Sequence, residues 1–176
     1  MNTWQCLRQV QYLLRNQKWT GSSNLVFAEG SVKITAAPPQ SVFEQLRMPA
    51  VMVRPLGATT DPEKGELPDL VEQEVAITLA VAHAGEAWGE YQIVGGHRAG
   101  QTESQGRGLL EVEEELFAAV ELLDTDDGVV VQHRVSSAVQ PERVGEQYLL
   151  MRDYLFRLRT SADRYYHPVE NLVGSA

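Results

Sequence analysis

The stretch VEQEVAITLAVA at residues 71–82 decides the fold of this chain. Val71, Gln73, Val75, Ile77, Leu79 and Val81 alternate there with Glu72, Glu74, Ala76, Thr78, Ala80 and Ala82. Apart from Gln73 the first set is apolar, and this period of two is that of a β-strand with one buried face. A second strand is predicted just before it at 50–54, because Pro49 opens a compact apolar run and Pro55 is expected to end it. These two strands predict a sheet at the centre of the protein.

Two other segments show the spacing of amphipathic helices, at 3–17 and 107–123. Their apolar stripes are Trp4, Leu7, Val10 and Leu14 in the first segment, and Leu109, Val112, Leu116, Val120 and Leu123 in the second. In the second helix the acidic run Glu113-Glu114-Glu115 is interpreted as a solvated face or as a contact for a basic patch of a neighbour.

The remaining chain contains weaker signals. Residues 129–135 alternate as a strand, and a turn at Pro141 and Gly145 leads into a long strand at 147–161, so these two strands are expected to form a terminal hairpin. Segments 25–28 and 32–36 form either a hairpin or an extended connection. The order of elements ends with an aperiodic tail. Two assignments complete the prediction: a helical turn from Ser41 to Leu46, and a loop or short helix within the glycine-rich segment 84–106.

Together these elements predict an α+β fold, a mixed but mostly antiparallel sheet with the two main helices packed on one face. Long loops between strands are expected at 56–69 and 84–106. The chain has 176 residues, of which 43% are hydrophobic and 22% charged, so we expect one core. The domain is predicted to span 1–163, followed by a C-terminal extension at 164–176, with no signal peptide and no membrane span.

The charge of the chain argues against nucleic acid as a bound partner. The chain has 15 basic residues and 24 acidic ones, which gives a net charge of −9. Gripping a phosphate backbone requires a basic surface, so proteins or small molecules are the expected partners. The single cysteine, Cys6, cannot form an internal disulfide. It lies in the first predicted helix and is expected to be a small buried residue of the protein core.

No motif in the sequence predicts catalysis, a cofactor or a metal. Gly106-Arg107-Gly108 lacks the third glycine of a dinucleotide loop, where Glu111 stands, and no Walker lysine motif is present. A calcium loop begun at Asp124 would need glycine at 129 and glutamate at 135, and valine occupies both positions. The four histidines have no metal-ligand spacing, and no serine occupies a Gly-x-Ser-x-Gly elbow.

Arginine and tyrosine crowd the last strand and the tail, and both are favoured at protein interfaces. An alternative is that the charges protect a sheet edge. The candidate interface residues are Asp61, Glu63 and Lys64 in the first long loop, Arg98 and Arg107 in and after the second, and Arg152, Arg157, Arg159, Arg164, Tyr165 and Tyr166 near the C-terminus.

Four stretches taken together resemble the tail terminator, or tail completion, proteins of long-tailed bacteriophages. The resemblance covers residues 1–163, through the order of elements, and leaves the tail without a counterpart. The stretches are PAVMVRPLG at 49–57, LVEQEVAITLAVAHAG at 70–85, RGLLEVEEELFAAVELLD at 107–124 and YLLMRDYLFRLRTSAD at 148–163.

The resemblance implies an α+β subunit of the virion that is made in the host cytoplasm and joins the tail or neck region. There it would form a homohexameric ring that caps the tail tube, ends its polymerisation and presents the joining surface for the head connector. The implied partners are copies of itself, the tail tube protein and the head-tail connector or stopper, with DNA passing through the channel unbound. Two alternatives stay open: another head-tail connector or stopper, and a small cytoplasmic ligand-binding domain or enzyme whose segment 95–108 covers a pocket.

Overall fold

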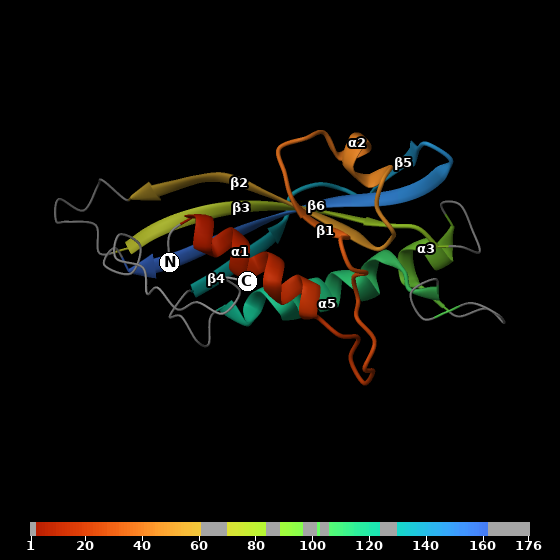
Figure 1. Ribbon diagram of the computed structural model, residues 1–176, viewed down its shortest axis with the longest axis horizontal. Helices are drawn as coiled ribbons and strands as arrows, with labels where there is room; N and C mark the ends of the chain where they lie inside the picture. The colour runs from red at the N-terminus through yellow and green to blue at the C-terminus, as the bar shows by residue number, and fades with distance from the viewer. Residues whose placement is uncertain are drawn as a thin grey trace.

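The computed structural model describes residues 3–60, 70–83, 89–96, 102, 106–123 and 130–161 (Figure 1). Helices and strands follow one another along these residues. They are α1 (Thr3–Asn16), β1 (Val32–Ile34), α2 (Pro39–Phe43), β2 (Ala50–Thr60), β3 (Leu70–Val81), α3 (Glu90–Val94), α5 (Leu109–Glu121), β4 (Val130–Val135), β5 (Gln140–Val144) and β6 (Gln147–Ser161).

The strands form one six-stranded sheet in the order β1-β2-β3-β6-β4, and β5 also pairs with β6. Only β1 and β2 run parallel, and all other neighbouring pairs are antiparallel. β3 and β6 pair along their whole common length, from Leu70 opposite Ser161 to Val81 opposite Leu150. The α+β fold with a mixed, largely antiparallel sheet is therefore confirmed.

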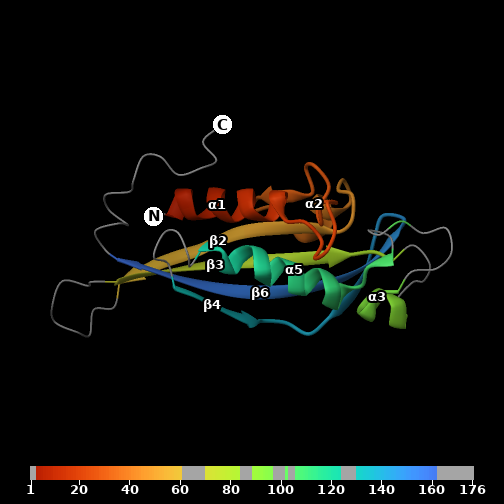
Figure 2. The same ribbon diagram turned by 90° about the horizontal axis from the view of Figure 1, so that it is seen from below.

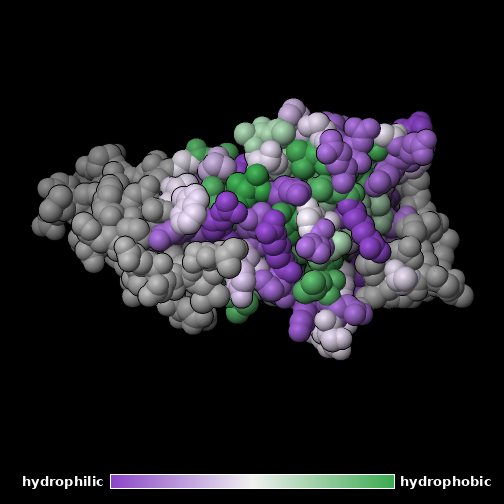
Figure 3. Space-filling view, viewed as in Figure 1, coloured by the Kyte–Doolittle hydropathy of each residue, from purple (hydrophilic) through white to green (hydrophobic). Residues whose placement is uncertain are grey.

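One hydrophobic cluster joins α1 and α5 to one face of the sheet (Figure 2). α1 contributes Cys6, Leu7, Val10 and Leu14 to this cluster, and the sheet contributes alternate residues such as Val75 and Ile77. The outward side of α1 carries polar residues such as Arg8 and Arg15, and hydrophilic side chains dominate the surface over α1 in Figure 3. Trp4 differs from the expected stripe, because it lies outside this cluster and is 62% exposed.

A second, smaller hydrophobic cluster lies on the opposite face, beneath α2. Phe43 of α2 is fully buried there against Met52 of β2, Ala80 of β3 and Leu149 of β6. Figure 1 draws α2 above the sheet and α5 below it. The short helix covers one end of this face.

β2 does not end at Pro55, as the sequence suggested, but continues to Thr60 through an irregularity between Pro55 and Gly57. β1 pairs with β2 only up to Val53, so from Arg54 onward β2 has no neighbour on that side within the described sheet. Proline lacks an N–H group and is tolerated at such an edge. The loop predicted from 56 thus begins after residue 60, and its residues 61–69 lie outside those described.

Segments 25–28 and 32–36 do not pair with each other as a hairpin. Val32–Ile34 instead pairs in parallel with β2, and the backbone of Leu25 bridges to Lys18. Ser31 fixes this arrangement, because its carbonyl accepts a hydrogen bond from the Val51 N–H over 2.8 Å and its hydroxyl donates to the Arg47 carbonyl over 2.6 Å.

The C-terminal strands also differ in one respect from the prediction. Pro141 lies within a strand, β5, and the tight turn that follows is formed at Gly145, with a φ of 60°, and Glu146. β4 and β5 pair in succession with the same long strand, β6. β6 is therefore the strand with which both β4 and β5 pair.

α3 and α5 meet backbone to backbone at two glycines. A Cβ atom added to Gly108 would lie only 2.6 Å from the carbonyl oxygen of Ile93. Gly95, which ends α3, has a φ of 82°, a conformation that side chains other than glycine rarely adopt. Segment 84–106, left open between loop and short helix, thus contains a helix at 90–94. Within the described ranges, no helix has the length and apolar character needed to cross a membrane.

Candidate functional site

The part of the sheet face that α2 leaves uncovered is the candidate site, and we call it the open face. It is built by alternate residues of four strands, beside the second hydrophobic cluster. Its side chains are Arg54 of β2, Glu72, Glu74, Ala76 and Thr78 of β3, Asp153, Leu155, Arg157 and Arg159 of β6, and Gln132 and Arg134 of β4.

Arginines of β6 face glutamates of β3 across the open face. In the strand register Arg157 lies opposite Glu74 and Arg159 opposite Glu72. Nε of Arg157 donates to Oε1 of Glu74 over 2.9 Å, and Nε of Arg159 donates to Oε2 of Glu72 over 2.9 Å. Both arginine side chains remain more than 40% exposed, so these pairs contribute little to stability.

A polar chain crosses the sheet next to these pairs. Nη2 of Arg54 donates to the Thr78 hydroxyl over 3.1 Å, and that hydroxyl donates to Oδ1 of Asp153 over 2.5 Å. Arg54 also lies 3.7 Å from the same carboxylate oxygen. Thr78 is almost fully buried, which makes this chain the boundary between the charged end of the face and the second hydrophobic cluster.

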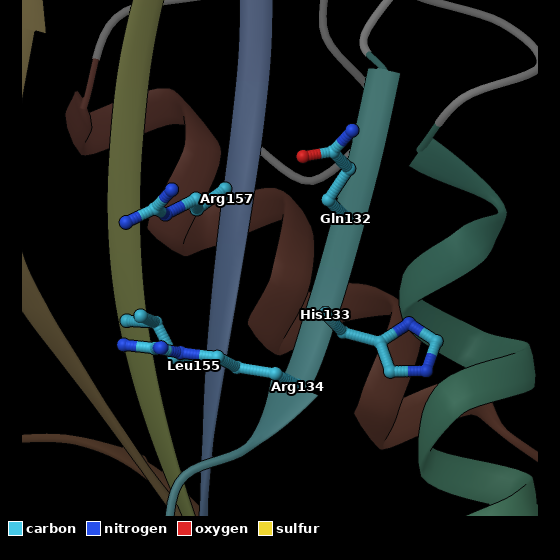
Figure 4. A pocket seen from close by; sticks show the side chains of 5 residues that line it. All are labelled: Gln132, His133, Arg134, Leu155 and Arg157. Carbon is cyan, nitrogen blue, oxygen red and sulfur yellow. The ribbon is translucent and has the colours of Figure 1, made fainter.

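A hollow of about 140 Å³ opens between β4 and β6 on this face and is lined by Gln132, His133, Arg134, Leu155 and Arg157. Figure 4 shows the side chain of Arg134 crossing β6 toward β3, that of Arg157 extending from β6 in the same direction, and that of His133 pointing away toward α5. His133 stacks there on Phe117, with ring centroids 4.1 Å apart. Two guanidinium groups therefore flank Leu155, which is 8% exposed.

Arg134 is the arginine of the open face for which the described residues supply no acidic partner, because the ion pairs there involve Arg54, Arg157 and Arg159. Arg157 makes its hydrogen bond through Nε, and no hydrogen bond to a described residue uses its terminal nitrogens. N–H groups of Arg134 and Arg157 beside the hollow are therefore available to an acceptor outside the described residues.

Of the candidate interface residues, Arg157 and Arg159 lie together on the open face. Arg152 and Arg107 are engaged within the chain: Arg152 pairs with Glu113 over 3.0 Å, whereas Arg107 pairs with Glu111 and lies over the ring of Trp19. The others lie outside the described residues, and they are Asp61, Glu63, Lys64, Arg98, Arg164, Tyr165 and Tyr166.

The interpretation of the acidic run in α5 as a solvated face is wrong for two of its three residues. Glu115 is 8% exposed and accepts hydrogen bonds from Nε2 of Gln17 and the Thr20 N–H, both over 2.7 Å. Glu113 accepts from the Tyr154 hydroxyl over 2.7 Å. Both glutamates border the apolar stripe of the helix, and only Glu114 faces outward.

Sequence reasoning missed Arg54, Gln132 and Arg134 as members of the site. The alternation of β3 and β6 was visible in the sequence, and it places Glu72, Glu74, Arg157 and Arg159 on the face away from the larger cluster. What the sequence did not indicate is that β4 pairs with β6 in the register that sets Gln132 opposite Arg157 and Arg134 opposite Leu155.

Two ionisable groups have pKa values shifted by burial. Burial raises the pKa of the Cys6 thiol to about 12, so Cys6 is an uncharged core residue, as the sequence predicted. Burial also raises the pKa of Tyr154, and the hydrogen bond to Glu113 raises it further. Both groups lie in the first hydrophobic cluster rather than on the open face.

Within the described ranges, no group of three or more histidine, cysteine, aspartate or glutamate side chains is placed to hold a metal ion. No protein-family model and no curated protein matches the sequence.

Proposed function

We propose that this chain is a structural protein of the virion of a long-tailed bacteriophage, a tail terminator. In this role copies of the chain form a ring, hexameric in the family it resembles. The ring caps the tail tube, ends its polymerisation and forms the joining surface for the head connector. The protein acts through its surfaces, without catalysis.

The observation that carries this proposal is the charge of the open face. Four arginines and three acids lie there, in a chain whose net charge is −9, so the rest of the chain is more acidic than the whole. A basic-leaning face on an acidic subunit complements a different surface of an identical subunit. Head-to-tail contacts between different surfaces close into rings when the rotation between subunits allows it.

The overall charge also suits a ring through which DNA passes. An acidic subunit repels the phosphate backbone, so DNA would move through the channel without being held. Three of the four arginines of the open face, Arg54, Arg157 and Arg159, are held near glutamates or an aspartate, which reduces their attraction for phosphate.

A second neck protein, such as a head-tail connector or stopper, fits the same subunit and would be distinguished by its position in the particle. The alternative of an enzyme or ligand-binding domain placed its pocket at segment 95–108. The hollow beside Arg134 takes no lining residue from that segment. Gly95 and Gly108 instead bring α3 against the start of α5.

Light scattering and negative-stain imaging of the purified chain test the proposal. We expect a ring with a central channel, which stops the growth of tail tubes when added to polymerising tube protein. Replacing both Arg157 and Arg159 by glutamine is expected to abolish ring formation, because both side chains lie on the open face and are more than 40% exposed.

The matched control is the double variant Arg8→Gln and Arg47→Gln, which removes two positive charges from exposed positions outside the open face. This control is expected to form rings as the wild type does. A chain that is monomeric at all concentrations and leaves tube growth unchanged would refute the proposed function.

A further inference from the structure

We propose that the open face of one copy of this chain receives the outward side of α5 of a second copy, and that Arg134 of the first copy pairs with Glu114 of the second. The inference rests on the proposed function, in which copies of the chain assemble, and it names the two surfaces that meet. Each copy has one surface of each kind, so the contact joins copies head to tail.

One straight row of residues across the sheet forms the floor of the receiving surface. Arg54 of β2 lies opposite Ala76 of β3, and Ala76 lies opposite Leu155 of β6. Arg134 of β4 completes the row opposite Leu155. The hydrogen bond of Arg54 to Thr78 directs its guanidinium group toward β3, and Figure 4 shows the side chain of Arg134 crossing β6 toward β3. Two apolar residues are therefore bordered by an inward-directed arginine at each end of the row.

Arg134 gives this row an unmatched positive charge. The other three arginines of the open face have acidic neighbours, whereas Arg134 has none among the described residues. Its side chain passes over Leu155, which is 8% exposed and lines the hollow with it. A guanidinium group binds a carboxylate through parallel hydrogen bonds, most strongly where water is partly excluded. The occupant should therefore bring a carboxylate to Arg134 and apolar side chains to the floor.

The outward side of α5 carries both kinds of side chain. Leu110 is 39% exposed, Leu122 at the C-terminal end of the helix is 51% exposed, and Glu114 and Ala118 between them are also exposed. Residues at intervals of four are neighbours on a helix, so these four form one stripe. The opposite side of α5 is buried in the first hydrophobic cluster. α5 thus has apolar side chains on two sides, and one of these sides is exposed in the single chain.

Glu114 is the acidic residue of this stripe. Glu111 and Glu113 of the same helix are paired with arginines, whereas no ion pair among the described residues involves Glu114. α5 packs on the face of the sheet opposite the open face, and Figure 2 shows it in front of β3 and β6. Glu114 and Arg134 therefore lie on opposite sides of one copy and can meet only between two copies.

The charge of the chain favours a second copy as the occupant. The open face has four arginines and three acids, whereas the whole chain has a net charge of −9, so other surfaces of the same chain are acidic. Two open faces in contact would bring like charges together, but an open face against the α5 stripe brings unlike charges together. Because the two surfaces lie on opposite sides of the subunit, repeated contacts form a ring when the rotation between subunits allows it.

Charge reversal at the two positions tests this contact. Arg134→Glu alone and Glu114→Arg alone are each expected to weaken self-association by about tenfold or more, measured by sedimentation velocity over a series of concentrations. An equimolar mixture of these two variants is expected to associate close to the wild-type level, because each variant then offers the other a surface of opposite charge.

The matched controls are Arg47→Glu and Glu29→Arg, which make the same charge changes at exposed residues outside both surfaces. Each control should associate as the wild type does. Circular dichroism melts of all four variants would establish that the fold is kept.

A mixture that associates no better than either variant alone would overturn the inference, and so would equal association of the Arg134→Glu and Arg47→Glu variants. Imaging of the wild type separates this result from the proposed function. Rings without recovery in the mixture would support the tail terminator and overturn the contact. Recovery in the mixture, with a wild type that associates but forms no ring and leaves tube growth unchanged, would support the contact and refute the tail terminator. A wild type that is monomeric at all concentrations would overturn both.

Discussion

The hydroxyl of Tyr154 donates a hydrogen bond over 2.7 Å to Oε2 of Glu113, and Nη1 of Arg152 reaches the same oxygen over 3.0 Å. Tyr154 belongs to β6 and is fully buried, whereas Glu113 belongs to α5. A single carboxylate thus attaches the second main helix to the long strand of the sheet. The acidic residue is part of the internal structure, although it belongs to a run that looks like a solvated helix face.

Tyr154→Phe removes the hydroxyl and keeps the ring, and we expect it to lower the free energy of unfolding by about 1–2 kcal/mol. Urea unfolding followed by circular dichroism would measure the change. Tyr12→Phe is the control, because Tyr12 is 37% exposed. It should change stability by less than about 0.5 kcal/mol. Equal effects of the two changes would contradict the role given to the Glu113 bond.

The buried thiol of Cys6 makes part of the stability dependent on pH. Its pKa, ordinarily 9.0, is raised to about 12 in the folded protein, because burial disfavours the thiolate. The folded state therefore holds this proton more tightly than the unfolded state does. The resulting stabilisation is fully present below about pH 9 and is lost as the pH rises toward 12.

Cys6→Ala should remove that contribution while losing some packing. The wild type is expected to be the more stable of the two proteins near pH 8. Its advantage should shrink by up to about 1.4 kcal/mol for each pH unit above the thiol's ordinary pKa. Urea unfolding of both proteins under a reductant, at about pH 8 and pH 10.5, would measure it. A constant difference between the two proteins would show that the thiol does not titrate in this way.

Phe43→Ala should expose the second hydrophobic cluster, because Phe43 is the buried residue of α2 that covers Met52, Ala80 and Leu149. Truncation of a buried phenylalanine typically costs about 3–5 kcal/mol. Thermal unfolding would measure the loss. Leu56→Ala removes an apolar side chain that is 57% exposed and should be close to neutral. A mild effect of Phe43→Ala would mean that α2 is not needed to cover this end of the sheet.

Gly108→Ala should separate α3 from α5, since the added Cβ would lie 2.6 Å from the carbonyl oxygen of Ile93. The backbone at Gly108 has a φ of −92°, which alanine adopts without strain, so the cost comes from the close approach alone. We expect a loss of about 1–3 kcal/mol in urea unfolding. Leu110→Ala, at an exposed position two residues further on, is the control. Wild-type stability of Gly108→Ala would contradict the tight contact.

Arg157→Gln and Arg159→Gln should each change the free energy of unfolding by less than about 1 kcal/mol, because exposed ion pairs contribute little. Their partners Glu74 and Glu72 remain hydrated when the arginine is removed. Urea unfolding of the double variant checks this. A loss of ring formation without a loss of stability would then report on assembly, whereas a large destabilisation would show that these pairs hold the sheet together.

The periodic parts of the chain were predictable, because burial on one face imposes a period that the sequence displays. Residues 71–82 and 107–123 show this for a strand and for a helix, and the structure has β3 and α5 there. Pro55 was misleading, because a proline stops a strand only where its missing N–H would be needed. Whether β2 has a neighbour at that point depends on the three-residue strand β1, whose sequence gives only a weak signal.

The candidate site was predictable only in part for a related reason. The alternation within β6 indicated that Arg157 and Arg159 share one face and Arg152 the other. Which side chains stand next to them depends on strand order and register, which link residues far apart in the chain, such as Arg134 and Leu155. The role of Glu113 likewise depends on Tyr154, a residue of another element.

The position of β6 at the end of the described chain has a consequence for how the protein is made. β3 pairs with β2 on one side and with residues 150–161 on the other, and both β4 and β5 pair with β6 alone. A ribosome therefore synthesises β1 to β5 before it makes the strand that joins β3 to β4 and β5. Until β6 leaves the ribosome exit tunnel, the backbone N–H and C=O groups along one edge of β3 are unpaired and can bind strands of other nascent chains. Rapid pairing of β6 with β3 after synthesis therefore protects the protein from aggregation.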